Sequence, residues 1–116
     1  MPVNLYDAAY ELEKAVRQSE EYSRLKQAYD EVNTDASAKD MFDNFRSIQL
    51  QLQQKQMMGE DISEEEVMQA QKSVALVQQN VKISKLMEAE QRMSMVIAEM
   101  NKIIMKPLEE LYGSME

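Results

Sequence analysis

The apolar residues of this chain recur at alternating spacings of three and four positions, the period of an α-helix with one buried face. Met41, Phe45, Ile48 and Leu52 follow this period, and no run shows the strict apolar–polar alternation of a β-strand. The pattern predicts an all-α fold. The expected helices span residues 4–17, 20–33, 36–58, 64–80 and 82–112.

Residues that favour helix starts precede the first three of these segments. Asn4 and Ser19 are placed to cap the first two helices, and either Thr34 or Asp35 is available for the third. The segment from residue 4 to residue 33 therefore predicts two short helices, or one long helix with a kink.

Three further positions predict where helices end or bend. Gly59 stands where a left-handed residue would close the third helix, and Ser63 with Glu66 has the spacing of a capping box. The apolar stripe changes phase just after Asn80, which predicts a break or a bend there. Pro107 has no backbone N–H, so the last helix should kink or restart near it.

The last helix carries the most regular pattern, a heptad repeat of about four heptads. This pattern is typical of a coiled-coil contact, either with another helix of the same chain or with a second copy. Because the two N-terminal helices are too short to cover both long helices, we expect a single helical domain, residues 1–116. This domain is a long-helix bundle with two short N-terminal helices, completed by homodimerisation.

The apolar stripes of the two long helices give the candidate contact residues. Those predicted to form the core or the dimer interface are Met41, Phe42, Phe45, Ile48, Leu52, Leu86, Met93, Ile97, Met100 and Ile104. The chain has 11 methionines, and methionine suits either gaps in a core or surfaces that adapt to a partner. Met95 and Met105 lie off the heptad core and are predicted to contact a protein partner.

Composition limits the chemistry available to the chain. It has no cysteine and no histidine, so thiol nucleophiles, thiolate ligands and imidazole bases are absent. The acidic run Glu60, Asp61 and Glu64–Glu66 lacks the EF-hand ligand pattern, and acidic residues are expected at a helix start. Glu90 on the apolar stripe has no second carboxylate paired with it. Glu90 should instead pair with Lys85 or Arg92, with a cation of a partner chain, or reach the solvent edge. We therefore predict no catalytic, cofactor or metal site.

The charge of −8 is spread along the chain, which disfavours a direct nucleic-acid surface. No stretch reaches the roughly 20 apolar residues of a membrane span, and the start of the chain lacks an export signal. The sequence thus predicts a cytoplasmic protein without membrane insertion.

Several motifs follow one another along the chain: the Leu12–Tyr22 stretch, Asp35 before the Ala38–Phe45 helix, the Gln/Leu-rich helix closing on Gly59, the Ile62–Glu66 restart, and Glu88–Glu90 leading into Ile97 and Asn101–Ile104. Their order resembles the YlbF/YmcA family of small helical proteins from Bacillus-type bacteria, and within it the YheA-like members. The resemblance spans nearly the whole chain.

The resemblance implies an all-α dimer that serves as a non-enzymatic accessory factor. Relatives of this kind assemble into a complex that supports messenger-RNA processing and influences competence, sporulation and biofilm formation. That complex is associated with iron–sulfur clusters held by cysteines, so cluster binding is not carried over to a chain without cysteine.

From residues and resemblance together we predict a non-enzymatic adaptor or regulatory protein that acts through protein–protein contacts with an unidentified partner. Two alternatives stay open: an RNA-binding accessory factor, which the net charge disfavours, and a holdase-like chaperone that cradles unfolded chains with its long helices.

Overall fold

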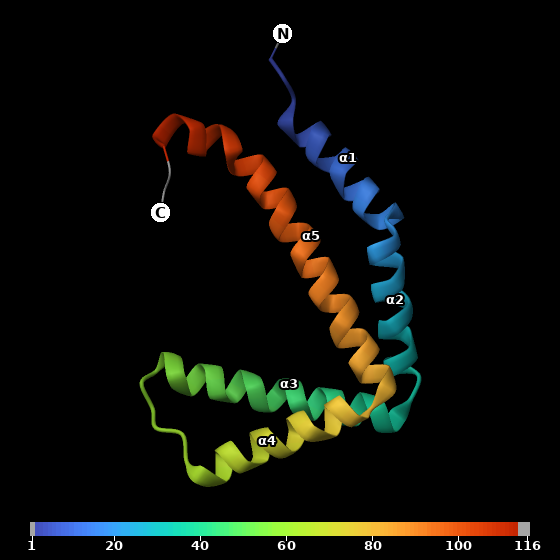
Figure 1. Cartoon of the computed structure of the whole chain (residues 1–116), viewed down its shortest axis with the longest axis vertical. Helices are drawn as coiled ribbons and strands as arrows, with labels where there is room; N and C mark the ends of the chain where they lie inside the picture. The colour runs from blue at the N-terminus through green and yellow to red at the C-terminus, as the bar shows by residue number, and fades with distance from the viewer. Residues whose placement is uncertain (1, 114–116) are drawn as a thin grey trace. The chain divides into compact units, whose positions relative to one another are not determined.

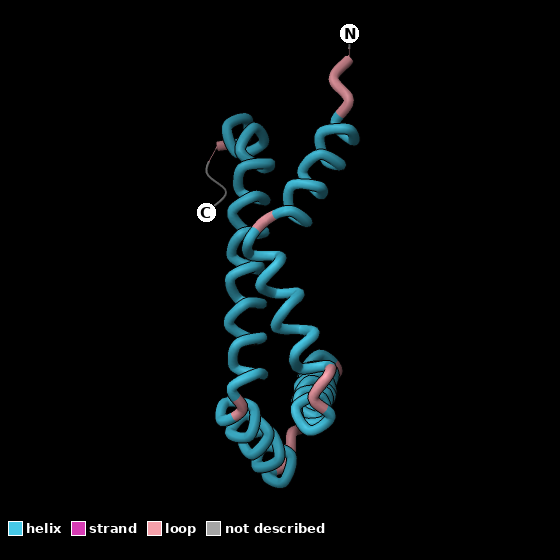
Figure 2. Tube along the Cα trace, turned by 90° about the vertical axis from the view of Figure 1, so that its right-hand side faces the viewer, coloured by secondary structure: helices cyan, strands magenta, loops and turns pink. Residues whose placement is uncertain are grey.

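The computed structural model describes residues 2–113, and within them every regular element is an α-helix (Figures 1 and 2). The elements of this part are α1 (Leu5–Gln18), α2 (Glu20–Asn33), α3 (Ala36–Met57), α4 (Glu64–Gln79) and α5 (Val81–Tyr112). The all-α prediction is confirmed, and each helix end lies within one residue of its expected position. Residues 5–33 form two helices rather than one kinked helix.

Short polar side chains fix the starts of the first three helices. Asn4 Oδ1 accepts hydrogen bonds from the backbone N–H groups of Tyr6 and Asp7 at 3.0 and 3.2 Å. Ser19 Oγ accepts one from the Tyr22 N–H at 3.2 Å. At α3 the cap is Asp35, whose side chain accepts from the Ala38 N–H at 3.1 Å. Each bond satisfies a donor that has no partner inside its helix.

The turn between α3 and α4 has the predicted geometry at both sides. Gly59 is left-handed, with φ of +71°, and its N–H donates to the Gln56 carbonyl at 3.2 Å. The next N–H, of Glu60, donates to the Lys55 carbonyl at 2.8 Å, which completes a Schellman motif. Four residues later, Ser63 and Glu66 form the reciprocal capping box. The end of α3 and the start of α4 are therefore each fixed by capping hydrogen bonds.

Asn80 is the single residue that separates α4 from α5. Its backbone is extended, and its N–H donates to the Val77 carbonyl at 3.2 Å. Its side chain accepts from the Ile83 N–H at 3.1 Å, so one residue closes α4 and caps α5. The predicted break is confirmed, although the capping role was not foreseen from the sequence.

The last helix passes through Pro107 without a restart and continues to Tyr112. Figure 1 shows α5 bending within its red C-terminal end. A proline in a helix interior removes one hydrogen bond and crowds the preceding turn, which accounts for a bend of this kind.

The described residues fall into two compact units. Unit 1 combines residues 2–25 with residues 88–113, and unit 2 is Lys26–Met87. The assignment of residues 1–116 to a single domain stays a prediction.

Unit 2 is built on α3 and α4, which pack side by side as a helical hairpin (Figure 1). Its buried hydrophobic residues are Ala28, Val32, Ala38, Phe42, Phe45, Val77, Ile83 and Leu86. The rings of Phe42 and Phe45 stack with centroids 6.5 Å apart, and the Arg46 guanidinium lies 5.2 Å from the Phe42 ring centroid. The buried Ser73 hydroxyl donates to the Ala70 carbonyl at 2.8 Å, so this core contains no unpaired polar side chain among the described residues.

Two ion pairs join residues far apart in the sequence of unit 2. Lys55 Nζ lies 2.6 Å from a Glu66 carboxylate oxygen beside the α3–α4 turn. Lys82 Nζ lies 3.1 Å from Asp35 Oδ2 and connects the start of α5 to the start of α3. One ion pair therefore connects α3 and α4 beside the turn of the hairpin, and the other connects α3 and α5 at the opposite end of the hairpin.

Candidate functional site

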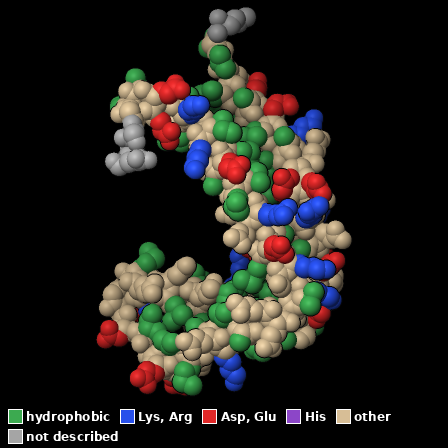
Figure 3. All heavy atoms as spheres, viewed as in Figure 1, with side chains coloured by type: hydrophobic (Ala, Val, Ile, Leu, Met, Phe, Trp, Pro, Cys, Tyr) green, Lys and Arg blue, Asp and Glu red, His purple; other side chains and the backbone are tan. Residues whose placement is uncertain are grey.

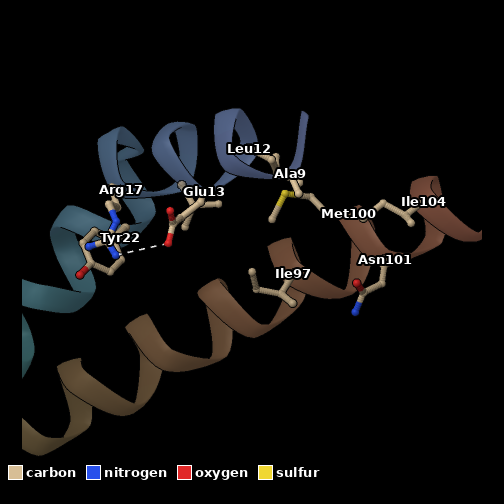
Figure 4. A pocket seen from close by; sticks show the side chains of 10 residues that line it. Ala9, Leu12, Glu13, Arg17, Tyr22, Ile97, Met100, Asn101 and Ile104 are labelled. Atoms are coloured by element: carbon tan, nitrogen blue, oxygen red, sulfur yellow. Dashed lines mark hydrogen bonds and ion pairs between the residues drawn. The ribbon is translucent and has the colours of Figure 1, made fainter. Parts of the chain in front are cut away.

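Unit 1 contains an open groove between α1 and α5, with a volume of about 420 Å³ (Figure 4). We call it the α1/α5 groove. Its lining residues are Ala9, Leu12, Glu13, Val16, Arg17, Tyr22, Ile97, Met100, Asn101 and Ile104.

The helical period places the apolar lining on the two facing helices. From α1 come Ala9, Leu12 and Val16, spaced three and four residues apart. From α5 come three more residues at the same spacing, Ile97, Met100 and Ile104. Figure 4 shows the Met100 side chain extending from α5 toward α1. Each helix thus contributes one apolar stripe to the groove.

The polar groups of the groove lie at its margin. Arg17 and Glu13 form an ion pair of 3.5 Å along α1, and both side chains are mostly exposed. An exposed pair of this kind adds little stability, typically under about 1 kcal/mol. Asn101 and the hydroxyl of Tyr22 are further polar groups of the lining. With an apolar floor and few polar groups, the groove suits the apolar side chains of another helix.

Burial decreases from one end of the α5 stripe to the other, though not residue by residue. We define this stripe as Met93, Ile97, Met100, Ile104, Leu108 and Leu111; Met93 is buried, Met100 is half-buried and Leu111 is exposed. Met93 is 9% exposed, Ile97 41% and Ile104 60%. The α1 stripe changes in the same way, from the half-buried Val16 to the exposed Leu5. Apolar side chains at helical spacing are therefore left in contact with solvent on both helices.

The structure divides the residues predicted for core or interface among three environments. Phe42, Phe45 and Leu86 are buried in unit 2, and Met93 is buried in unit 1. Half-buried positions are Met41, Ile48, Leu52 and Met100, whereas Ile97 and Ile104 are exposed. Within this chain the last two are not core residues, so their assignment to a dimer interface stays a prediction.

The two predicted partner contacts, Met95 and Met105, are both exposed. Sequence reasoning did not assign Leu12 and Val16 of α1, or Tyr22 of α2, to any site. The apolar stripe of the first helix was visible in the sequence, but nothing in its pattern indicated that this stripe faces the last helix.

Ion pairs and capping hydrogen bonds shift the pKa values of two carboxylates in the described residues, Asp35 and Glu66. The N–H of Ala38 and the Lys82 ammonium hold the pKa of Asp35 below its usual range. Lys55 and the Ser63 backbone and hydroxyl do the same for the pKa of Glu66. No group of three or more acidic residues in residues 2–113 is arranged to hold a metal ion. The half-buried Glu90 forms no ion pair with Lys85 or Arg92 within this part of the chain.

Comparison with known proteins identifies the family. Residues 5–109 match the family model described as "Control of competence regulator ComK, YlbF/YmcA". The chain belongs to the YlbF/YmcA family.

Its relatives within the family match from end to end. A UPF0342 protein of Bacillus licheniformis is 78% identical over 100% of this chain and 99% of its own length, and the UPF0342 protein YheA of Bacillus subtilis is 73% identical over the same shares. A solved structure, a protein of unknown function (DUF964) from Bacillus stearothermophilus, is 51% identical. It covers 97% of this chain and 98% of its own, with a TM-score of 0.85. The resemblance to the YlbF/YmcA family and its YheA-like members is therefore confirmed.

Within residues 2–113, none of the helices combines the length and apolar character that crossing a bilayer requires.

Proposed function

We propose that this YlbF/YmcA-family protein is a non-enzymatic regulatory adaptor that acts as a homodimer and through contacts with a protein partner. The supporting observation is the solvent-exposed pair of apolar stripes on α1 and α5. Heptad spacing is the pattern with which one helix recognises another.

Energetics favour covering these stripes. Burying an isoleucine or leucine side chain contributes about 1.5–3 kcal/mol relative to leaving it in water. Ile97, Ile104 and Leu108 are each between two fifths and two thirds exposed within the chain, and they lie on one face of α5. A second copy that covers these three residues would add part of this contribution to the free energy of association.

The biological role is proposed from the family. The matching family model is described as controlling the competence regulator ComK, and we propose that this chain serves regulation of the same broad kind in Bacillus-type bacteria. By family resemblance, this regulation includes an accessory role in RNA processing that is exerted through protein contacts, since a charge of −8 disfavours direct RNA binding.

Light scattering on wild type and on Ile97→Asp tests the dimer. The wild type is expected to have twice the mass of one chain, and the aspartate should weaken association by about 100-fold or more, because it buries a charge in an apolar contact. Gln91→Asp is the matched control, since Gln91 is exposed on the same helix away from the α5 stripe.

A monomeric wild type would exclude the dimer. Equal dimer masses for all three proteins would show that the α5 stripe is not the interface. Circular dichroism must show unchanged helicity in both variants for the comparison to count.

A further inference from the structure

The end of the α3–α4 hairpin exposes methionines next to carboxylates. We define the hairpin tip as the outward-facing residues beside the turn: Met57, Met58, Glu60, Asp61, Glu64, Glu65 and Met68. All seven are exposed, and the Lys55–Glu66 ion pair of 2.6 Å holds the two helix ends together beneath them.

The methionines of the tip are among the most exposed apolar residues of the chain. Met57 is 87% exposed, Met58 74% and Met68 69%. Methionine has three rotatable bonds and a polarizable sulfur, so a group of exposed methionines can adapt to the apolar face of a partner.

The carboxylates of the tip form no ion pairs within the described part of the chain. Glu66 is occupied by Lys55 and by the capping box, whereas Glu60, Asp61, Glu64 and Glu65 take part in none of the ion pairs there. No lysine or arginine occurs between Lys55 and Lys72. Figure 3 shows acidic and hydrophobic side chains together at the end of this hairpin, at lower left.

The backbone beneath the tip is already ordered. A Schellman motif closes α3, and a capping box opens α4. Binding of a partner at the tip therefore requires little loss of conformational entropy in the turn, and such preorganisation favours binding.

We propose that the hairpin tip docks a basic amphipathic helix of a partner protein, with the partner's apolar face on the methionines and its lysines or arginines against the four free carboxylates. A second copy of this chain is disfavoured at this position, because tip-to-tip contact would place eight carboxylates together. The tip is separate from the α1/α5 groove in sequence and lies in the other unit, so this proposal goes beyond the dimer.

The probe is a fluorescein-labelled helix of leucine and lysine of about 18 residues, long enough for five turns. The full-length protein should raise its fluorescence anisotropy in a saturable way. Affinity should fall by about tenfold between low and physiological salt, because the carboxylates are exposed. A peptide with the same leucines and with glutamate in place of lysine should bind at least about tenfold more weakly.

Two variants locate the binding surface. Replacing Met57, Met58 and Met68 with serine should weaken binding by about tenfold through lost apolar contact. Replacing Glu60, Glu64 and Glu65 with glutamine should weaken it similarly and reduce the salt dependence. Matched controls in unit 1 are Ile103→Ser, at an exposed apolar position, and the pair Glu109→Gln with Glu110→Gln, which should leave binding unchanged.

Absence of saturable binding to the wild type overturns the proposal, as does equal binding by the tip variants and the unit 1 controls. A fall in solution mass of the tip variants would assign the tip to a second copy of this chain, which also overturns it. Light scattering on Ile97→Asp tests the homodimer separately. A failure of the hairpin-tip proposal can therefore be distinguished from a failure of the proposed homodimer.

Discussion

Lys55 Nζ and a Glu66 carboxylate oxygen lie 2.6 Å apart, although ten residues of turn and helix end separate them in the sequence. Glu66 also accepts hydrogen bonds from the backbone N–H and the hydroxyl of Ser63, at 3.2 and 3.0 Å. One carboxylate therefore fastens the end of α3 to the start of α4 while it caps α4. These contacts favour its charged form and lower its pKa.

The lowered pKa of Glu66 predicts a pH dependence of stability. A carboxylate whose pKa is lower in the folded state stabilises the fold above its unfolded pKa, about 4.3, and loses this contribution as pH falls through the folded value. Urea midpoints of the wild type should therefore decrease below about pH 4.3 more steeply than those of Glu66→Gln. Glu64→Gln is the control and should follow the wild type. If the urea midpoints of the wild type and of Glu66→Gln decreased equally as the pH fell, Glu66 would not be the source of the pH dependence.

Asp35 combines a helix cap with an ion pair, and two substitutions separate these roles. Asp35→Asn keeps an oxygen for the Ala38 N–H but loses the attraction of Lys82, whereas Asp35→Ala loses both. We expect the alanine variant to be less stable than the asparagine variant in thermal unfolding. The hydrogen bond from the Ala38 N–H is the main cause of the lowered pKa of Asp35, so equal stability of the two variants would argue against the importance of the cap.

Leu86 is fully buried in unit 2, at 1% exposure. Leu86→Ala should lower the free energy of unfolding by about 2–5 kcal/mol, because it removes apolar contacts and leaves a cavity. Ile103→Ala, at an exposed position of the same helix, should change it by less than about 0.5 kcal/mol. Chemical denaturation of both variants measures the difference, and similar losses would show that the burial at Leu86 does not hold in solution.

Gly59 has a positive φ, and no atom lies close enough to meet a Cβ placed there. The expected cost of Gly59→Ala is therefore one of backbone conformation alone, about 1 kcal/mol. Met58→Ala provides the neighbouring control, since Met58 is right-handed at the helix end and exposed. An unchanged unfolding midpoint for Gly59→Ala would mean that the turn relaxes to another conformation.

Helix positions could be predicted from the sequence because their signals are local. Asn4, Ser19, Asp35 and the Ser63–Glu66 box each act on backbone groups within three residues. The change in phase of the apolar stripe after Asn80 is also a local signal, and it predicted the break between α4 and α5.

Contacts between distant residues could not be predicted in the same way. The Lys82–Asp35 pair joins residues 47 positions apart, and many lysines were equally available to Asp35. The heptad pattern likewise named Ile97 and Ile104 as contact residues, but periodicity alone does not say whether the same chain covers them. Their exposure, and the position of α1 opposite them in the groove, depend on tertiary packing.

The division of the chain has a consequence for its synthesis on the ribosome. Unit 2 is continuous in sequence, so all of Lys26–Met87 can fold as soon as it has emerged. Unit 1 joins residues on either side of that segment, and α1 must wait with its apolar stripe uncovered until the later part of α5 has been translated. The hairpin should therefore be the first part of the nascent protein to resist proteolysis, with α1 protected last.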